Sequence, residues 1–215
     1  MAKVKICGNT NPKDAWHARE LGADFLGLIF TTSKRKVTLN QAREIMEAVP
    51  GFEQFVGVFA NQPKEYVDAT VKALGLKWVQ FHGTETSRYC DFFTECGLYV
   101  IKSFRIRDEM SLKRIGEYNV TAFLFDTYSR ESTGGTGTSF DWSILEGKPY
   151  AQEKLFLAGG LSVDNLEAAI RQVNPYAVDV VSGVEKSPGI KDESLLEQFI
   201  AIAKGRSPTE RQIKK

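Results

Sequence analysis

The sequence predicts an α/β fold, a single closed barrel of about eight parallel strand–helix units, on three observations. Short apolar runs alternate with amphipathic stretches at spacings of roughly 20–30 residues. The apolar runs are continuous, which is typical of parallel strands that are covered on both faces. The chain has 215 residues and 42% hydrophobic content, which suits one large core better than two. Together these features favour a single (β/α)₈ TIM barrel.

A doubly wound open sheet is the competing fold. That fold usually has fewer units and a G-x-G-x-x-G fingerprint after its first strand, whereas here the first strand runs into Gly8-Asn9-Thr10. No linker or low-complexity segment divides the chain. We therefore expect one domain over residues 1–204, followed by a polar, basic and frayed tail over residues 205–215.

The expected strands are the eight apolar runs, taken in order along the chain. They span residues 4–7, 25–30, 55–59, 78–81, 99–103, 122–125, 155–158 and 177–181. The first helix begins at Pro12, with Thr10 or Asn11 as its cap. Thr38 and Gln41 form the pattern of a capping box at the start of the second. Glycines end three of the helices, at Gly22, Gly75 and Gly97.

The second half of the chain carries weaker helix signals. We expect a weak helix over residues 108–118 and a short one over residues 140–145. Ser162 is the expected cap of the helix after the seventh strand. The last helix is expected to bury an apolar stripe made of Leu196, Phe199, Ile200 and Ala203.

Composition limits the classes of function. The formal net charge is +1, so there is no global field to attract nucleic acid. The three cysteines, Cys7, Cys90 and Cys96, form no disulfide framework, which indicates a reducing compartment. With two histidines and no CxxC, we expect no metal site. No signal peptide and no apolar run long enough to span a bilayer is present, so a soluble cytoplasmic protein is expected.

Polar residues follow several expected strands, and in a barrel all strand carboxyl ends open on one face. They are Cys7, Arg35, His82 and Asp126. Each has a structural alternative: a free cysteine is commonly a buried apolar group, and Arg35 lies in a basic run that solvent alone would explain. His82 could cap a helix, and Asp126 could simply end its strand before the loop that holds Gly134–Gly137. The sequence leaves these alternatives open.

Two small-residue pairs give a more specific signal. Gly159-Gly160 follows the seventh strand and Ser182-Gly183 follows the eighth, where many barrels bind a phosphate group through backbone N–H groups. The alternative is that these are turn glycines. Asp179 lies inside the apolar eighth strand, where a carboxylate is unfavourable unless it is satisfied, so we expect it to face a pocket.

The motifs of the chain, in order, resemble those of the phosphoribosylanthranilate isomerase family of the tryptophan pathway, from Lys3 to about Lys204. Ser33-Lys34-Arg35 lacks the middle proline of many members, and Phe81 replaces a more usual leucine. Neither change removes a residue with an expected role. The matching motifs are Lys5-Ile-Cys-Gly8, Gly22-Ala-Asp24, Ser33-Lys-Arg35, Gln80-Phe-His-Gly83, Phe125-Asp-Thr127, Gly134-Gly-Thr-Gly137, Phe140-Asp-Trp142, Ala158-Gly-Gly-Leu161, Ser182-Gly-Val-Glu185 and Pro188-Gly-Ile-Lys-Asp192.

The resemblance implies an Amadori rearrangement of a small phosphorylated substrate. It implies Asp126 as general acid and Cys7 as general base, with Arg35 on the anthranilate carboxylate. The resemblance also implies that the phosphate binds to the backbone of Gly159, Gly160, Ser182 and Gly183. It implies that His82 and Asp179 line the pocket. No metal or cofactor is implied, and family members occur as monomers and homodimers.

Two other functions fit the same barrel. A histidine-pathway sugar isomerase would resemble this chain, but that family leads us to expect aspartates at the ends of strands one and six, whereas strand one ends in Cys7. A phosphate-ligand sensor without turnover is the other. The presence of both Cys7 and Asp126 argues against it.

Overall fold

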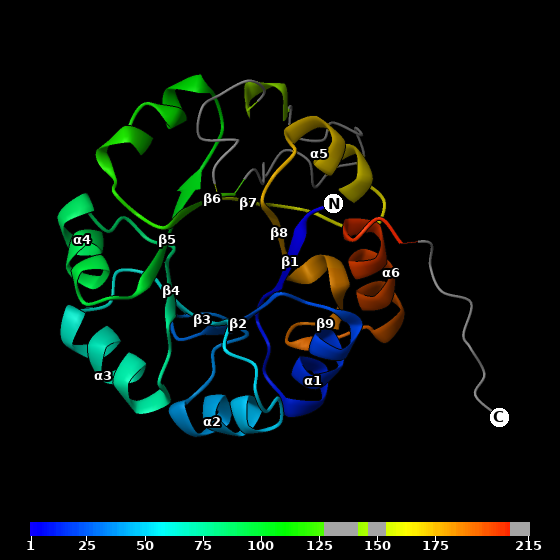
Figure 1. Cartoon of the computed structure of the whole chain (residues 1–215), viewed down its shortest axis with the longest axis horizontal. Helices are drawn as coiled ribbons and strands as arrows, with labels where there is room; N and C mark the ends of the chain where they lie inside the picture. Colours follow the sequence, from blue (N-terminus) through cyan, green and yellow to red (C-terminus); the bar gives the residue numbers. More distant parts are fainter. Residues whose placement is uncertain (127–141, 146–153, 207–215) are drawn as a thin grey trace.

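The computed structural model describes residues 1–126, 142–145 and 154–206. Its eight parallel strands form one closed ring in the order of the sequence, and β8 pairs with β1 to close it (Figure 1). The predicted (β/α)₈ barrel is therefore confirmed. The strands are β1 (Lys3–Ile6), β2 (Phe25–Ile29), β3 (Phe55–Phe59), β4 (Trp78–Phe81), β5 (Tyr99–Arg105), β6 (Ala122–Asp126), β7 (Leu155–Ala158) and β8 (Ala177–Val180).

Helices cover the outside of the ring (Figure 1). Asn11, not Thr10, caps the first one by accepting a hydrogen bond from the Asp14 backbone N–H at 2.9 Å. The capping box of Thr38 and Gln41 is present as predicted. The helices are α1 (Pro12–Leu21), α2 (Leu39–Glu47), α3 (Lys64–Leu74), α4 (Ser87–Glu95), α5 (Leu166–Val173) and α6 (Glu193–Ala203).

Two helix predictions in the second half were wrong. Residues 108–118 form two 3₁₀ helices, η1 (Glu109–Leu112) and η2 (Ile115–Glu117), instead of one α-helix. The Asp108 carboxylate accepts from the Ser111 backbone N–H and tightens the first turn. Gly116 disfavours a continuous α-helix. The prediction that Ser162 caps α5 was also wrong, because the residue before this helix is Asn165. Ser162 contributes its backbone carbonyl, which accepts from the Leu166 N–H in the first turn. Of the short helix expected at 140–145, Trp142–Leu145 is a 3₁₀ helix (η4), and residues 140 and 141 lie outside the described residues, as do Gly134–Gly137.

A short hairpin after β8 was not predicted. The 3₁₀ helix η6 (Ser182–Val184) leads into β9 (Glu185–Ser187), which pairs antiparallel with β10 (Ile190–Lys191). The hairpin lies beside α1 in Figure 1. The Lys191 backbone N–H donates to the Asp14 carboxylate at 2.8 Å, and the Thr10 hydroxyl donates to the Gly189 carbonyl. These bonds fix the hairpin over the end of β1.

The barrel interior changes from apolar to polar along its axis. The part of the interior away from the carboxyl ends of the strands is filled by apolar side chains, namely Phe25, Val56, Ile101, Ala122, Leu124, Phe156 and Ala177. Towards the carboxyl ends of the strands, buried polar side chains replace them, namely Lys5, Gln80, Ser103 and Asp179. A larger apolar cluster joins the outer strand faces to the helices and includes the four predicted residues of α6. The polar layer therefore lies beneath the carboxyl ends of the strands.

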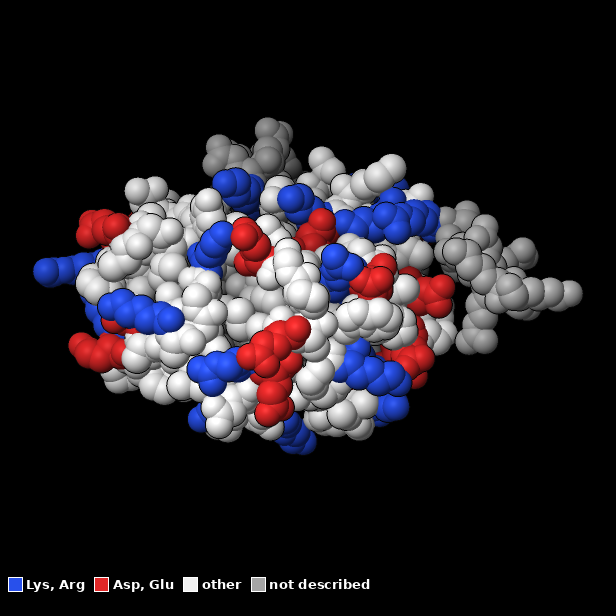
Figure 2. All heavy atoms as spheres, turned by 60° about the horizontal axis from the view of Figure 1, so that its bottom comes forward, with Lys and Arg blue, Asp and Glu red and all other residues white. Residues whose placement is uncertain are grey.

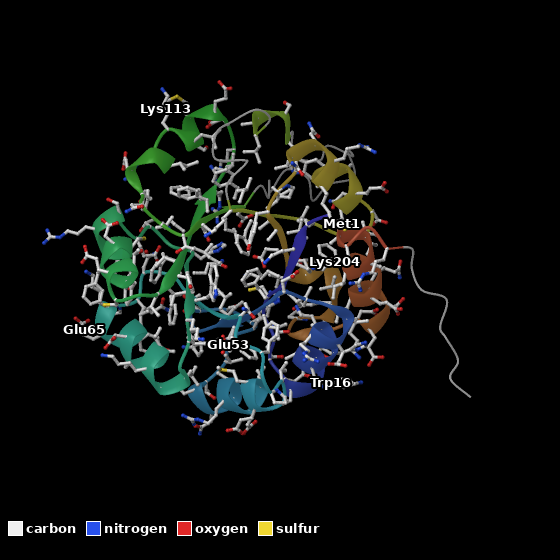
Figure 3. The ribbon with its side chains drawn as sticks, viewed as in Figure 1. Met1, Trp16, Glu53, Glu65, Lys113 and Lys204 are labelled. Carbon is white, nitrogen blue, oxygen red and sulfur yellow. The ribbon has the colours of Figure 1, made fainter. Side chains whose placement is uncertain are left out.

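The two ends of the barrel chain meet. The Ala2 N–H donates to the Ala203 carbonyl at 2.9 Å, and Met1 and Lys204 lie near each other in Figure 3. The face seen in Figure 2 carries charges of both signs, interspersed. No helix in the described ranges is long and apolar enough to cross a membrane. The division into a domain over 1–204 and a tail stays a prediction, since residues 207–215 lie outside the described chain.

Candidate active site

A cavity of about 540 Å³ opens at the carboxyl ends of the strands. It lies where the sequence places the functional residues of a parallel barrel. All nine predicted site residues line it, although they come from six strand ends. They are Cys7, Arg35, His82, Asp126, Gly159, Gly160, Asp179, Ser182 and Gly183.

Cys7 follows β1 and is buried at the cavity wall. Its backbone N–H donates to the Val180 carbonyl at 2.9 Å, which fixes the residue between β1 and β8. The space for its thiol comes from Gly27 on β2, because a Cβ there would lie 2.4 Å from the Cys7 sulfur. Any residue other than glycine at position 27 would therefore displace the thiol.

Charged groups surround the thiol inside the barrel. The Lys5 ammonium is completely buried and lies 2.9 Å from the Asp179 carboxylate, its neighbour across the β1–β8 pair. Burial raises the pKa of Cys7; Lys5 and Lys191 oppose that rise, while Asp179 adds to it. Burial disfavours the charge of Lys5, but Asp179 and Cys7 outweigh it and the pKa of Lys5 is raised. Lys5 therefore stays a cation beside a thiol that needs one to ionise.

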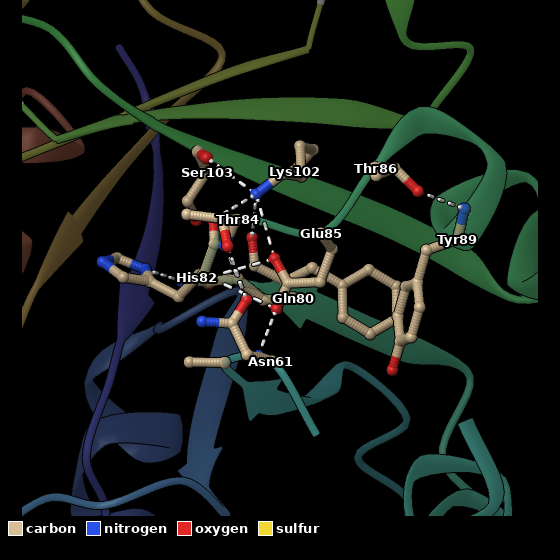
Figure 4. Close-up of polar contacts among 12 residues, drawn as sticks. Asn61, Gln80, His82, Thr84, Glu85, Thr86, Tyr89, Lys102 and Ser103 are labelled. Carbon is tan, nitrogen blue, oxygen red and sulfur yellow. Dashed lines mark hydrogen bonds and ion pairs between the residues drawn. The ribbon is translucent and has the colours of Figure 1, made fainter. Parts of the chain in front are cut away.

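Asp126 is the last residue of β6, not the residue after it, and its carboxylate shares the cavity with His82. His82 Nε2 lies 3.5 Å from Asp126 Oδ2. On the other side of the ring, Gln80 Nε2 lies 2.9 Å from His82 Nδ1 (Figure 4). An amide nitrogen only donates, so in this arrangement Nδ1 accepts and Nε2 carries the hydrogen towards Asp126. His82 does not cap α4; Thr86 does.

The loop that carries His82 is fixed from below by a buried ion pair. The Lys102 ammonium lies 3.1 Å from Glu85 Oε2 and donates to the Gly83 carbonyl at 2.8 Å (Figure 4). Glu85 in turn accepts from the Asn61 backbone N–H at 2.7 Å. A second cavity, of about 360 Å³, lies on this side and shares His82 and Asp126 with the first.

Small residues after β7 and β8 form the opposite wall. Gly159, Gly160, Ser182 and Gly183 line the same cavity. A Cβ on Gly183 would lie 2.0 Å from the Leu161 carbonyl oxygen, so only glycine lets the two loops approach this closely. The short helix η6 begins at Ser182. This wall presents backbone rather than bulky side chains to a ligand.

Arg35 reaches the cavity from the loop after β2, and it is not a freely solvated residue of a basic run. Its guanidinium holds the Glu185 carboxylate through Nε and Nη2, with distances of 2.5–2.9 Å. The sequence reasoning missed this pairing. It also missed Lys5, Gly27 and Lys191, of which only the Lys-x-Cys spacing of the first strand gave any signal, since alternate strand residues share a face.

Metal-ligating residues do not gather in the described ranges, where no group of three or more His, Cys, Asp or Glu side chains is placed to hold an ion. The three cysteines are free thiols, with Cys90 buried and Cys96 exposed. The absence of a metal or cofactor stays a prediction. The groups that the site does offer are a carboxyl group, a thiol beside a cation, and a wall of small residues.

The fold and this cavity are those of a (β/α)₈-barrel enzyme. A sequence profile of N-(5'-phosphoribosyl)anthranilate isomerase matches residues 4–202. The chain belongs to this family, the isomerases of tryptophan biosynthesis.

Relatives and solved structures agree with this assignment. The isomerase of Pelobacter propionicus is 47% identical over 205 residues, which cover 95% of this chain and 96% of that protein. The isomerase crystal structure from Thermotoga maritima superimposes with a TM-score of 0.85 at 40% identity, over 95% of this chain and 100% of that one. A phosphoribosylanthranilate isomerase in complex with reduced 1-(o-carboxyphenylamino)-1-deoxyribulose 5-phosphate gives 0.83 at 37% identity, with the same coverage.

Proposed function

We propose that the chain converts N-(5-phosphoribosyl)anthranilate to 1-(2-carboxyphenylamino)-1-deoxyribulose 5-phosphate by an Amadori rearrangement, with Asp126 as general acid and Cys7 as general base. The observation that carries the proposal is that both groups open into one cavity with a glycine-lined wall. A sugar phosphate held at that wall can present its ring oxygen to one group and its C2 proton to the other.

The acid step opens the sugar. Asp126, in its protonated form, donates a proton to the ring oxygen of the ribose, so the furanose C1–O bond breaks and a Schiff base forms with the substrate's own nitrogen. His82, whose Nε2 lies 3.5 Å from Asp126 Oδ2, borders the same space and orients the carboxyl group. A positioned acid or base contributes typically about 10²–10⁴ in rate.

The base step moves the proton from C2. The Cys7 thiolate removes it, and the electrons flow into the iminium nitrogen to give an enolamine. Tautomerisation then moves the hydroxyl proton of C2 to C1 and leaves the ketone, so the product is an isomer of the substrate. The nitrogen is the electron sink, and the Lys5 cation favours the thiolate that starts the step.

Binding is divided between two anionic groups of the substrate. The phosphate is assigned to the backbone N–H groups of Gly159, Gly160, Ser182 and Gly183, because these small residues let a ligand approach the backbone. The carboxylate is assigned to Arg35, whose planar fork suits two oxygens. Asp179 acts from the cavity floor through Lys5. The complex of a relative with a phosphorylated product analogue supports this class of ligand.

Turnover tests the proposal directly. The protein is incubated with freshly made phosphoribosylanthranilate, and the loss of substrate fluorescence is followed. We expect turnover by the wild type, and we expect Asp126→Asn and Cys7→Ser each to lose most of it while still binding product. Full activity in either variant would remove that residue from its role.

The same assay separates the other candidates. A sensor binds the substrate without turnover, and a histidine-pathway isomerase leaves phosphoribosylanthranilate unchanged. Arg35→Ala is expected to raise KM, and an unchanged KM would remove Arg35 from the carboxylate site. We propose a cytoplasmic enzyme, in keeping with its three free thiols, and a monomer or homodimer, since a relative from Thermotoga maritima is described as dimeric.

A further inference from the structure

Arg35, Glu185 and Lys191 form a compact group of charges at the edge of the cavity, called here the hairpin ion cluster. Arg35 Nε lies 2.8 and 2.9 Å from the two carboxylate oxygens of Glu185, and Arg35 Nη2 lies 2.5 Å from Oε2. The Glu185 side chain is 3% exposed, and that of Arg35 is 20% exposed. Two of the three guanidinium nitrogens are thus occupied by a buried carboxylate.

The other side of Glu185 is held by the hairpin itself. Lys191 Nζ lies 3.2 Å from Glu185 Oε1, and the Gly189 backbone N–H donates to the same oxygen at 3.2 Å. Lys191 is 1% exposed and also donates to the carbonyl of Cys7, at 2.6 Å. Glu185 therefore cannot rotate away from Arg35 without losing partners, and the cluster is tied to the backbone of the catalytic thiol.

The charges in the cluster do not cancel. Burial opposes ionisation of Glu185, but the hydrogen bonds from Arg35 and the charge of Lys191 outweigh it and its pKa is lowered. The hydrogen bond to Glu185 raises the pKa of Arg35. Burial lowers the pKa of Lys191, against the attraction of Glu185. With Lys191 protonated, two cations and one anion leave a net positive charge that attracts a carboxylate.

One donor edge of Arg35 remains for a ligand. Nη1 makes no hydrogen bond to any residue in the described part of the chain, and Arg35 lines the cavity. An arginine side chain has many rotamers, and a ligand that must first order it loses binding free energy. The Glu185 carboxylate, by holding Nε and Nη2, removes this loss of binding free energy and orients the third nitrogen, Nη1.

We propose that Glu185, held by Lys191, is the positioning residue that orients Arg35 towards the carboxylate of the substrate. Glu185 touches no substrate atom and acts through Arg35 alone. The inference rests on the proposed function, because it requires that Arg35 meets that carboxylate. It adds a specificity-determining residue from the β9–β10 hairpin.

The experiment compares two substrates with Glu185→Gln. One is phosphoribosylanthranilate, and the other is the phosphoribosyl adduct of aniline, which has no carboxylate. Because hydrogen bonds to charged groups are the stronger ones, we expect KM for the first substrate to rise about tenfold or more, with kcat within about twofold of wild type. KM for the aniline adduct is expected to stay unchanged. A general structural defect would affect both substrates alike.

Two variants complete the design. Glu53→Gln removes one charge of an exposed pair with Lys77 in the loop before β3 (Figure 3) and is expected to behave as wild type. Glu185→Gln in an Arg35→Ala background is expected to have no further effect on KM, because its only route is gone. If Glu185→Gln does not fold, Glu185→Asp, which keeps the charge but withdraws the oxygens, undergoes the same comparison.

The outcomes are distinguishable. Equal rises in KM for both substrates, an unchanged KM for phosphoribosylanthranilate, or additive effects with Arg35→Ala would overturn the inference while leaving the isomerase intact. A wild type that turns over neither substrate would overturn the proposed function, and this inference with it.

Discussion

Gly27→Ala is the substitution whose effect the structure defines most closely. The new Cβ would lie 2.4 Å from the Cys7 sulfur and 3.1 Å from its Cα. The ordinary separation of non-bonded carbon atoms is about 3.5–4.0 Å, so the thiol must move by roughly 1 Å. A displacement of about 1 Å at a reacting group can lower the rate by about 10², equivalent to about 2.7 kcal/mol in the barrier. We expect kcat to fall by that factor.

The stability of the same variant must be separated from its activity. Overpacking typically costs about 1–3 kcal/mol in folding free energy. Gly57→Ala on β3 is a matched control, since its Cβ would lie 2.9 Å from Leu76 and from Phe59, which belong to the core between barrel and helices. It should lose stability to a similar degree and keep its kcat.

The assay is the loss of substrate fluorescence, with thermal unfolding of both variants measured in the same buffer. Alkylation of Cys7 by iodoacetamide reports whether the thiol has moved or changed its ionisation. A Gly27→Ala enzyme with the kcat of the wild type would refute the reasoning, because the thiol would then tolerate displacement. A Gly57→Ala enzyme with the same loss of kcat would refute it too.

Three further predictions concern charge and stability. Burial raises the pKa of Cys7 and Lys5 opposes that rise, so kcat/KM should increase with pH as the thiol ionises. Lys5→Met should move this rise in kcat/KM to higher pH. A pH profile that is the same in the variant and the wild type would contradict the role of Lys5. Lys102→Met leaves the Glu85 carboxylate buried without its cation, and chemical denaturation should show a loss of roughly 3–5 kcal/mol, whereas a loss below about 1 kcal/mol would mean that water replaces the ammonium. Asn11→Ala removes the side-chain cap of α1 and should lower stability by about 1 kcal/mol with KM unchanged, and a changed KM would show coupling to the site.

The sequence was sufficient for the barrel and for the location of the site, because both follow from repetition. Each strand is a short apolar run, and each carboxyl end points to the same face. The residues just past those runs were therefore predicted to converge, and Cys7, Arg35 and His82 do line one cavity. Strand ends were off by one or two residues, which moved Asp126 onto the last position of β6.

The remaining features depend on partners that are distant in the chain. A lysine in a strand ordinarily indicates an exposed side chain. Lys5 is buried because its ammonium pairs with Asp179, which lies 174 residues further along the chain. The β9–β10 hairpin has two very short, largely exposed strands with no apolar pattern, so nothing local indicated it. Its importance lies in Glu185, which reaches Arg35 across 150 residues of sequence.

The closure of the ring by β8 against β1 has a consequence for synthesis of the protein. Cys7 is made first, but its N–H bonds to Val180, and the cation beside it pairs with Asp179. At about 5–20 residues per second, a ribosome needs roughly 10–35 s more to supply these partners. A nascent chain released before β8 thus carries its thiol without the two residues that fix it, because Val180 holds the Cys7 backbone and Asp179 holds the Lys5 ammonium.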